Sequence, residues 1–129
     1  APAGSGEFLV VDDEPAIRSL CGQMLKVLGF TVSTAPDGLE ALDVYRRHRA
    51  AIVCVLLDVT MPRLDGEGTL RELRKLNPEV RVILTSGYSR HDVTSQFTGQ
   101  PFSAFLQKPF NTRELGLAVQ QPLGNPAAE

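Results

Sequence analysis

The sequence predicts a single α/β domain in which a parallel sheet carries helices on both faces. Apolar runs of strand length alternate, five times over, with stretches whose apolar residues recur every three or four positions. Short helical crossovers of this kind require parallel neighbouring strands. A length of 129 residues suits one hydrophobic core and is too short for two.

The first half of the chain contains two predicted strand–helix units. A short apolar strand over Glu7–Val11 runs into acids and Pro15, which suit the first turn of a helix. Gly29 is the expected end of this helix. Its predicted apolar face consists of Ile17, Leu20, Cys21, Met24, Leu25 and Leu28. A second strand over residues 30–35 precedes a helix that carries Leu39, Ala41, Leu42 and Tyr45 and ends in the basic, solvated cluster 46–49.

The third strand is the centre of the predicted fold. Six consecutive apolar residues, several of them β-branched, begin at Ile52 and end at Asp58, which indicates a strand buried on both faces. Pro62 prevents this strand from continuing far beyond its acid. The sequence therefore places a carboxylate at the carboxyl end of a central strand, where open α/β sheets build their sites.

Three further helices and two strands are expected after this point. Leu70, Leu73 and Leu76 mark a third helix that stops at Asn77-Pro78. A fourth strand from Val80 to Leu84 is followed by a weak helix, with Ser89 as its cap and Val93 and Phe97 on its apolar face. A short fifth strand over residues 104–106 leads to Lys108. The last helix is capped by Asn111 or Thr112 and carries Leu115, Leu117 and Val119.

The carboxyl ends of these strands share one edge of the sheet. The side chains expected there are Asp12, Asp13, Asp58, Thr85, Ser86 and Lys108. Three carboxylates at close range raise one another's pKa unless a cation lies between them, and Mg²⁺ prefers such oxygen ligands. A carboxylate oxygen of Asp58 can then attack a phosphoryl group, while Lys108 and the Ser86 hydroxyl stabilise its charge.

Four motifs in the expected order carry a resemblance to a known family. They are Val10-Val11-Asp12-Asp13-Glu14-Pro15, Leu57-Asp58-Val59-Thr60-Met61-Pro62 with Asp65-Gly66, Leu84-Thr85-Ser86-Gly87, and Lys108-Pro109-Phe110. Together they resemble the receiver domain of two-component response regulators over residues 7–121. Residues 1–6 are then a linker or a cloning remnant, and residues 122–129 a C-terminal tail.

The resemblance implies a flavodoxin-like sheet with strand order 2-1-3-4-5 and a phosphorylated Asp58. The phosphodonor would be the phosphohistidine of a histidine kinase or a histidine phosphotransfer domain, in trans or in the same polypeptide. Asp13, Asp58 and the Thr60 backbone carbonyl would bind Mg²⁺ or Mn²⁺, and Asp12 would hold the cation through water. The catalysis expected of the chain is limited to its own phosphorylation and slow autodephosphorylation.

The resemblance also implies a switch that reports the phosphorylation state. Ser86 would be the switch hydroxyl, although the neighbouring Thr85 is an alternative. Lys108 would contact the phosphate, next to a cis Lys108–Pro109 bond. Phe105 would be the aromatic residue that swings inward, although an aromatic residue at this position is often part of the core. The output partner is expected to lie outside these 129 residues.

Two other functions stay open at this point. A small-molecule phosphatase with an aspartyl-phosphate intermediate usually has a second Asp two residues after the first, where this chain has Thr60. A receiver-like interaction module that is never phosphorylated would not need Asp13, Asp58 and Lys108.

Charge and composition exclude several classes of partner. A net charge of -2 without a long Lys/Arg run predicts neither nucleic-acid binding nor membrane contact, and no apolar stretch approaches the length of a membrane span. Cys21 and Cys54 lack metal-ligand spacing, so we expect buried, reduced thiols in a cytoplasmic protein. His48 and His91 are expected at the surface.

The sequences of residues 86–89 and 107–110 resemble those of receivers fused to hybrid sensor histidine kinases. Together with the missing initial Met, this resemblance favours a receiver excised from such a kinase over a stand-alone protein.

Overall fold

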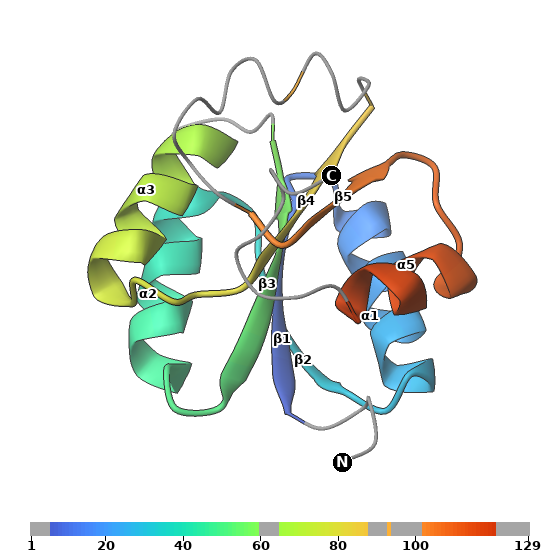
Figure 1. Cartoon of the computed structure of the whole chain (residues 1–129), viewed down its shortest axis with the longest axis horizontal. Helices are drawn as coiled ribbons and strands as arrows, with labels where there is room; N and C mark the ends of the chain where they lie inside the picture. The colour runs from blue at the N-terminus through green and yellow to red at the C-terminus, as the bar shows by residue number, and fades with distance from the viewer. Residues whose placement is uncertain (1–5, 60–64, 88–92, 94–101, 121–129) are drawn as a thin grey trace.

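Five parallel strands form one sheet with helices on both faces, as expected from the sequence. The computed structural model describes residues 6–59, 65–87, 93 and 102–120. The strand order is β2-β1-β3-β4-β5, which confirms the order implied by the resemblance (Figure 1). The strands are β1 (Glu7–Val11), β2 (Thr31–Ala35), β3 (Ile52–Asp58), β4 (Val82–Ser86) and β5 (Ala104–Gln107). The helices are α1 (Pro15–Val27), α2 (Gly38–His48), α3 (Gly66–Leu76) and α5 (Thr112–Val119).

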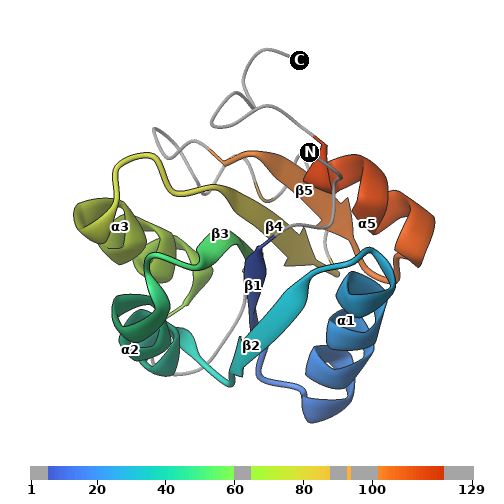
Figure 2. The same cartoon turned by 90° about the horizontal axis from the view of Figure 1, so that it is seen from below.

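The sheet separates two hydrophobic core clusters. Figure 2 shows α2 and α3 on one face of the sheet and α1 and α5 on the other. Side chains alternate between the faces of a strand, so in β1 Leu9 packs toward α2 and α3, whereas Phe8 packs toward α1. In β3, Val55 and Leu57 join the first cluster, and Cys54 and Leu56 join the second. The prediction that β3 is buried on both faces is therefore confirmed for most of its length.

Val53 is the exception in β3, because 41% of it is exposed. The pairing register with β1 shifts here, since Glu7 pairs with Ile52 whereas Phe8 pairs with Cys54. Val53 therefore lies beside the amino-terminal edge of the sheet, at the opposite end from Asp58. The irregularity leaves the carboxyl half of the strand in register.

Three leucines of the predicted helices are more exposed than expected. Leu20, Leu39 and Leu117 are 47%, 49% and 55% exposed. Successive residues of a helix are separated by about 100° around its axis. In α1 the buried stripe runs through Cys21 and Leu25, so Leu20 lies at its border and faces solvent. In α5, Leu115, Ala118 and Val119 form the buried face, which places Leu117 outside it.

The helix ends follow the predicted local chemistry. Gly29 has a φ of 101° just after α1, a conformation that glycine adopts at no steric cost. Asn111, rather than Thr112, caps α5: its side chain accepts a hydrogen bond from the Glu114 N–H at 2.8 Å, and the Glu114 carboxylate accepts one from the Asn111 N–H at 2.9 Å. His48, at the end of α2, is exposed and its Nδ1 lies 3.0 Å from Glu7 Oε2.

Some sequence predictions fall outside the described residues. These are the linker at residues 1–5, the Thr60 carbonyl and Pro62, the Ser89 cap, His91, Phe97 and the tail from residue 121. Val93, from the same predicted helix as Ser89, is helical and buried in the cluster under α2 and α3. Within the described ranges, no helix combines the length and apolarity that a membrane crossing requires.

Candidate functional site

The carboxyl ends of four neighbouring strands bring the predicted site residues to one edge of the sheet. Asp12 and Asp13 follow β1, and Asp58 is the last residue of β3. Pairing of β3 with β4 aligns Asp58 with Thr85. Lys108 comes directly after β5, and its backbone N–H donates a 2.7 Å hydrogen bond to the Ser86 carbonyl. The parallel topology therefore assembles these side chains without a contribution from the opposite edge.

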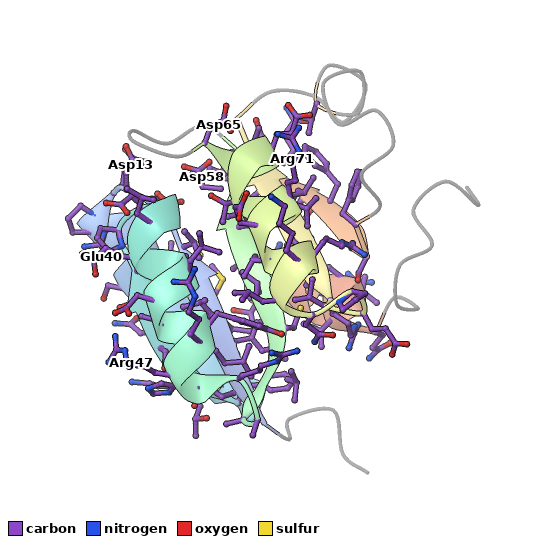
Figure 3. The ribbon with its side chains drawn as sticks, turned by 90° about the vertical axis from the view of Figure 1, so that its left-hand side faces the viewer. Asp13, Glu40, Arg47, Asp58, Asp65 and Arg71 are labelled. Carbon is purple, nitrogen blue, oxygen red and sulfur yellow. The ribbon has the colours of Figure 1, made fainter. Side chains whose placement is uncertain are left out.

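Asp12, Asp13 and Asp58 form a cluster of carboxylates. One carboxylate oxygen from each residue lies within 4.8 Å of the others. Asp12 and Asp58 are buried, at 3% and 5% exposure, whereas Asp13 is exposed and lies on the solvent side of the cluster. Figure 3 shows Asp13 and Asp58 at the same end of the molecule, with Asp65 nearby. An all-oxygen donor set with one side open to water fits a hard divalent cation such as Mg²⁺.

Lys108 supplies the positive charge of the site. Its Nζ lies 2.9 Å from Asp12 Oδ2 and 3.5 Å from Asp58 Oδ1. Burial of the ammonium acts to lower its pKa, but the hydrogen bond to Asp12 and the charges of Asp58, Asp12 and Glu14 outweigh burial and raise the pKa above its usual range. The side chain is thus held charged between two buried acids. The Lys108–Pro109 peptide bond is cis, as the resemblance implies.

Asp12 is fixed by contacts at both ends of the residue. Its Oδ1 accepts a hydrogen bond from the Glu14 N–H at 3.0 Å, and its own N–H donates to the Ala35 carbonyl at 3.2 Å. The Asp12 carbonyl accepts a 2.8 Å hydrogen bond from Arg18 Nη1. Arg18 was not among the site residues predicted from the sequence, because its contact with Asp12 depends on how α1 packs beside the acids.

Gly66, like Arg18, could not be assigned a role from the sequence, although it lies in one of the four motifs. Its N–H donates a 2.8 Å hydrogen bond to the Val59 carbonyl, just after Asp58. A Cβ at position 66 would lie 2.6 Å from Val59 Cα, 2.7 Å from Val59 O and 3.0 Å from Asp58 O. Only a residue without a side chain permits α3 to begin this close to the end of β3. Asp65 caps the same helix through its carboxylate, which accepts from the Gly68 N–H.

The two candidate switch hydroxyls and the candidate switch aromatic residue occupy different environments. Ser86 and Thr85 are both buried at the end of β4, so both alternatives stay open. Phe105 is half-buried in β5 and packs against the core cluster under α2 and α3. Both cysteines are buried and free, as predicted. Burial raises the pKa of Cys21 to about 11, with a further contribution from Asp12, and that of Cys54 to about 12.

Comparisons with known proteins agree with this geometry. The family model of the response regulator receiver domain matches residues 8–120. Sensor kinase CckA of Brucella abortus is 36% identical over 121 residues; the match covers 94% of this chain, which spans only 13% of the length of that protein.

Two solved structures share the fold at low sequence identity. The CheX–CheY–BeF₃–Mg²⁺ complex from Borrelia burgdorferi aligns with a TM-score of 0.85 and 28% identity, covering 92% of this chain and 94% of the matched one. A sensor histidine kinase receiver domain from Pseudomonas aeruginosa, with a magnesium ion coordinated in its active-site cleft, aligns with a TM-score of 0.81 and 28% identity, covering 90% and 95%. The chain therefore belongs to the response regulator receiver family and is a receiver domain of two-component signalling systems.

Proposed function

We propose that Asp58 is the phosphoacceptor of this receiver domain and takes the phosphoryl group from a phosphohistidine. The observation that carries the proposal is the position of its buried carboxylate, which lies 3.5 Å from the Lys108 ammonium inside a cluster of oxygen ligands. A carboxylate at the end of a rigid central strand, beside a fixed cation, suits a nucleophile for phosphoryl transfer.

The residues of the cluster would have different roles in the transfer. Asp13, Asp58 and the Thr60 carbonyl would bind Mg²⁺ or Mn²⁺, with Asp12 acting through water. When bound, the cation would supply positive charge that stabilises the phosphoryl oxygens. A carboxylate oxygen of Asp58 forms the new P–O bond as the P–N bond to the donor imidazole breaks, and the electron pair of that bond returns to the nitrogen. Lys108 stabilises the negative charge on the transferred group.

Phosphorylation then changes the edge of the sheet that an output partner would recognise. A phosphoryl group adds roughly 1.5 to 2 negative charges, which the Ser86 or Thr85 hydroxyl and Lys108 can contact. Phe105, only half-buried in β5, is the aromatic residue that we propose to move. The partners in this proposal are a histidine kinase or histidine phosphotransfer domain, in trans or in the same polypeptide, and an output partner of unspecified type; the domain itself would act in the cytoplasm.

Chemical phosphorylation tests the proposal directly. Acetyl phosphate with Mg²⁺ should add the mass of one phosphoryl group to the wild type and to Asp65→Asn, but not to Asp58→Asn. Asp65 is the matched control because it is an acid near the same edge but lies exposed at the start of α3 (Figure 3). Beryllofluoride should bind with the same pattern. Equal labelling of the wild type and Asp58→Asn would refute the assignment.

The same experiment separates the two other functions considered from the sequence. Sustained turnover of a free phosphate ester by the wild type would indicate a small-molecule phosphatase. Absence of labelling in the wild type, with intact Mg²⁺ binding, would indicate an interaction module that is never phosphorylated. The phosphatase is not expected, because Thr60 stands where those enzymes usually have a second Asp. The interaction module is not expected, because Asp13, Asp58 and Lys108 converge in the fold.

A further inference from the structure

Arg18 reaches back from α1 to the loop that carries the first two acids of the site. Its backbone N–H donates to the Glu14 carbonyl at 3.0 Å, a contact that ties the residue to the start of the helix. Its side chain is half-buried, and Nη1 donates a 2.8 Å hydrogen bond to the Asp12 carbonyl. Within the part of the chain that the structure describes, the guanidinium therefore contacts the main chain of the site.

The carbonyl that Arg18 holds belongs to the peptide unit joining Asp12 to Asp13. A peptide unit is planar, so fixing its oxygen also fixes the direction of the N–H and Cα of the next residue. Asp12 has further restraints, because its carboxylate accepts hydrogen bonds from Glu14 and Lys108. Asp13 is exposed, so packing constrains its side chain less, and its direction depends on this peptide unit.

We propose that Arg18 is a positioning residue that orients the Asp12–Asp13 peptide unit, so that the Asp13 carboxylate faces Asp58. This inference rests on the proposed function, since the divalent cation is the ligand that the two carboxylates would share. Partners behind the direct ligands of a metal site typically change its affinity by about 10- to 100-fold when they are removed.

The sign of the effect separates positioning from simple charge. Arg18 carries a positive charge near a cation site, and like charges repel. If the charge alone mattered, removing it would strengthen Mg²⁺ binding. If Arg18 orients the peptide unit, removing it weakens Mg²⁺ binding, because Asp13 no longer faces Asp58 in most molecules.

The experiment compares three variants of the full chain by calorimetric titration with Mg²⁺. Arg18→Met retains an unbranched stem and a good helix former but removes the guanidinium. We expect its affinity to fall about tenfold. Arg18→Lys keeps the charge on a shorter side chain, and its Mg²⁺ affinity should lie between that of Arg18→Met and that of the wild type. Lys26→Met removes the same charge from an exposed position in the last turn of α1 and should leave the affinity unchanged.

A second readout reports on the peptide unit itself. In ¹H–¹⁵N spectra without metal, the Asp13 amide resonance should move in Arg18→Met and stay in place in Lys26→Met. Equal or tighter Mg²⁺ binding by Arg18→Met would overturn the inference, even if urea unfolding showed a less stable fold. If the wild type itself bound no Mg²⁺, the cation site of the proposed function would fail, and the inference with it.

Discussion

Replacing Gly66 by alanine tests how closely α3 must approach β3, the strand that ends at Asp58. The added Cβ would lie 2.6 Å and 2.7 Å from Val59 Cα and O, and 3.0 Å from the Asp58 carbonyl oxygen. All three neighbours are backbone atoms, which cannot rotate away as the end of a side chain can. Either the first turn of α3 or the end of β3 must therefore shift.

The expected cost follows from the number and kind of these contacts. Overpacking in a well-packed interior costs typically about 1–3 kcal/mol, and backbone neighbours place Gly66→Ala in the upper half of that range. The greater helix propensity of alanine offsets less than about 1 kcal/mol. We therefore expect a net loss of about 2 kcal/mol in the free energy of unfolding.

Urea unfolding provides the measurement, and Gly116→Ala is the matched control. Gly116 lies inside α5, where the nearest described neighbour of a Cβ would be the end of the Leu28 side chain at 3.4 Å. Alanine there should stabilise the fold by about 0.5–1 kcal/mol. Acetyl phosphate labelling of Gly66→Ala should also slow, because Asp58 follows any shift of its strand. Unchanged stability and labelling in Gly66→Ala would refute the argument from close approach.

Three further predictions concern the acids, the thiols and a helix cap. Mg²⁺ at ten times its Kd should raise the free energy of unfolding of the wild type by about 1.4 kcal/mol, and Asp13→Asn should lose most of this gain in urea titrations. Cys21 and Cys54 should resist iodoacetamide at about pH 8 in the folded chain and react after unfolding, because burial raises their pKa values to about 11 and about 12. Because these folded pKa values exceed the unfolded value of 9.0, the stability that the two protonated thiols contribute is complete below pH 9.0 and is lost as the pH rises toward about 12. A rise in the free energy of unfolding over that window, in a pH series of urea titrations, would contradict this expectation. Asn111→Ala removes the capping box of α5 and should cost about 1 kcal/mol, an expectation that an unchanged urea midpoint would contradict.

The sheet could be predicted from the sequence because its signals are local and strong. The apolar run ending at Asp58 predicted the bounds of β3, Ile52–Asp58, and the structure has the same bounds. Helix faces were predicted less well. Leu20 was placed on an apolar face because it follows Ile17 by three residues, and Leu117 because it lies among the apolar residues of the last predicted helix, yet a narrow buried stripe leaves both exposed. The width of that stripe depends on how a helix lies on the sheet, which spacing does not encode.

Some residues of the candidate site could be predicted from the sequence and others could not. Asp12, Asp13, Asp58 and Lys108 could be predicted because parallel strands bring their carboxyl ends to one edge. Gly66 and Arg18 could not be assigned a role, because each acts on main-chain atoms: Val59 and Asp58 for the glycine, the Asp12 carbonyl for the arginine. A carbonyl is present at every residue, so no complementary residue type marks such contacts in a sequence.

The two distances from Lys108 indicate how a phosphoryl group at Asp58 would be sensed under the proposed function. Its ammonium lies 2.9 Å from Asp12 and 3.5 Å from Asp58, so its closer partner is the acid that we do not assign as acceptor. Phosphorylation places roughly 1.5 to 2 negative charges on the more distant partner, which favours movement of the ammonium toward it. The backbone N–H of Lys108 donates a hydrogen bond to the Ser86 carbonyl. Movement of Lys108 therefore affects the position of the end of β4, where both candidate hydroxyls lie. A single hydrogen-bonded lysine can thus connect the charge on β3 to the geometry of β4 and β5.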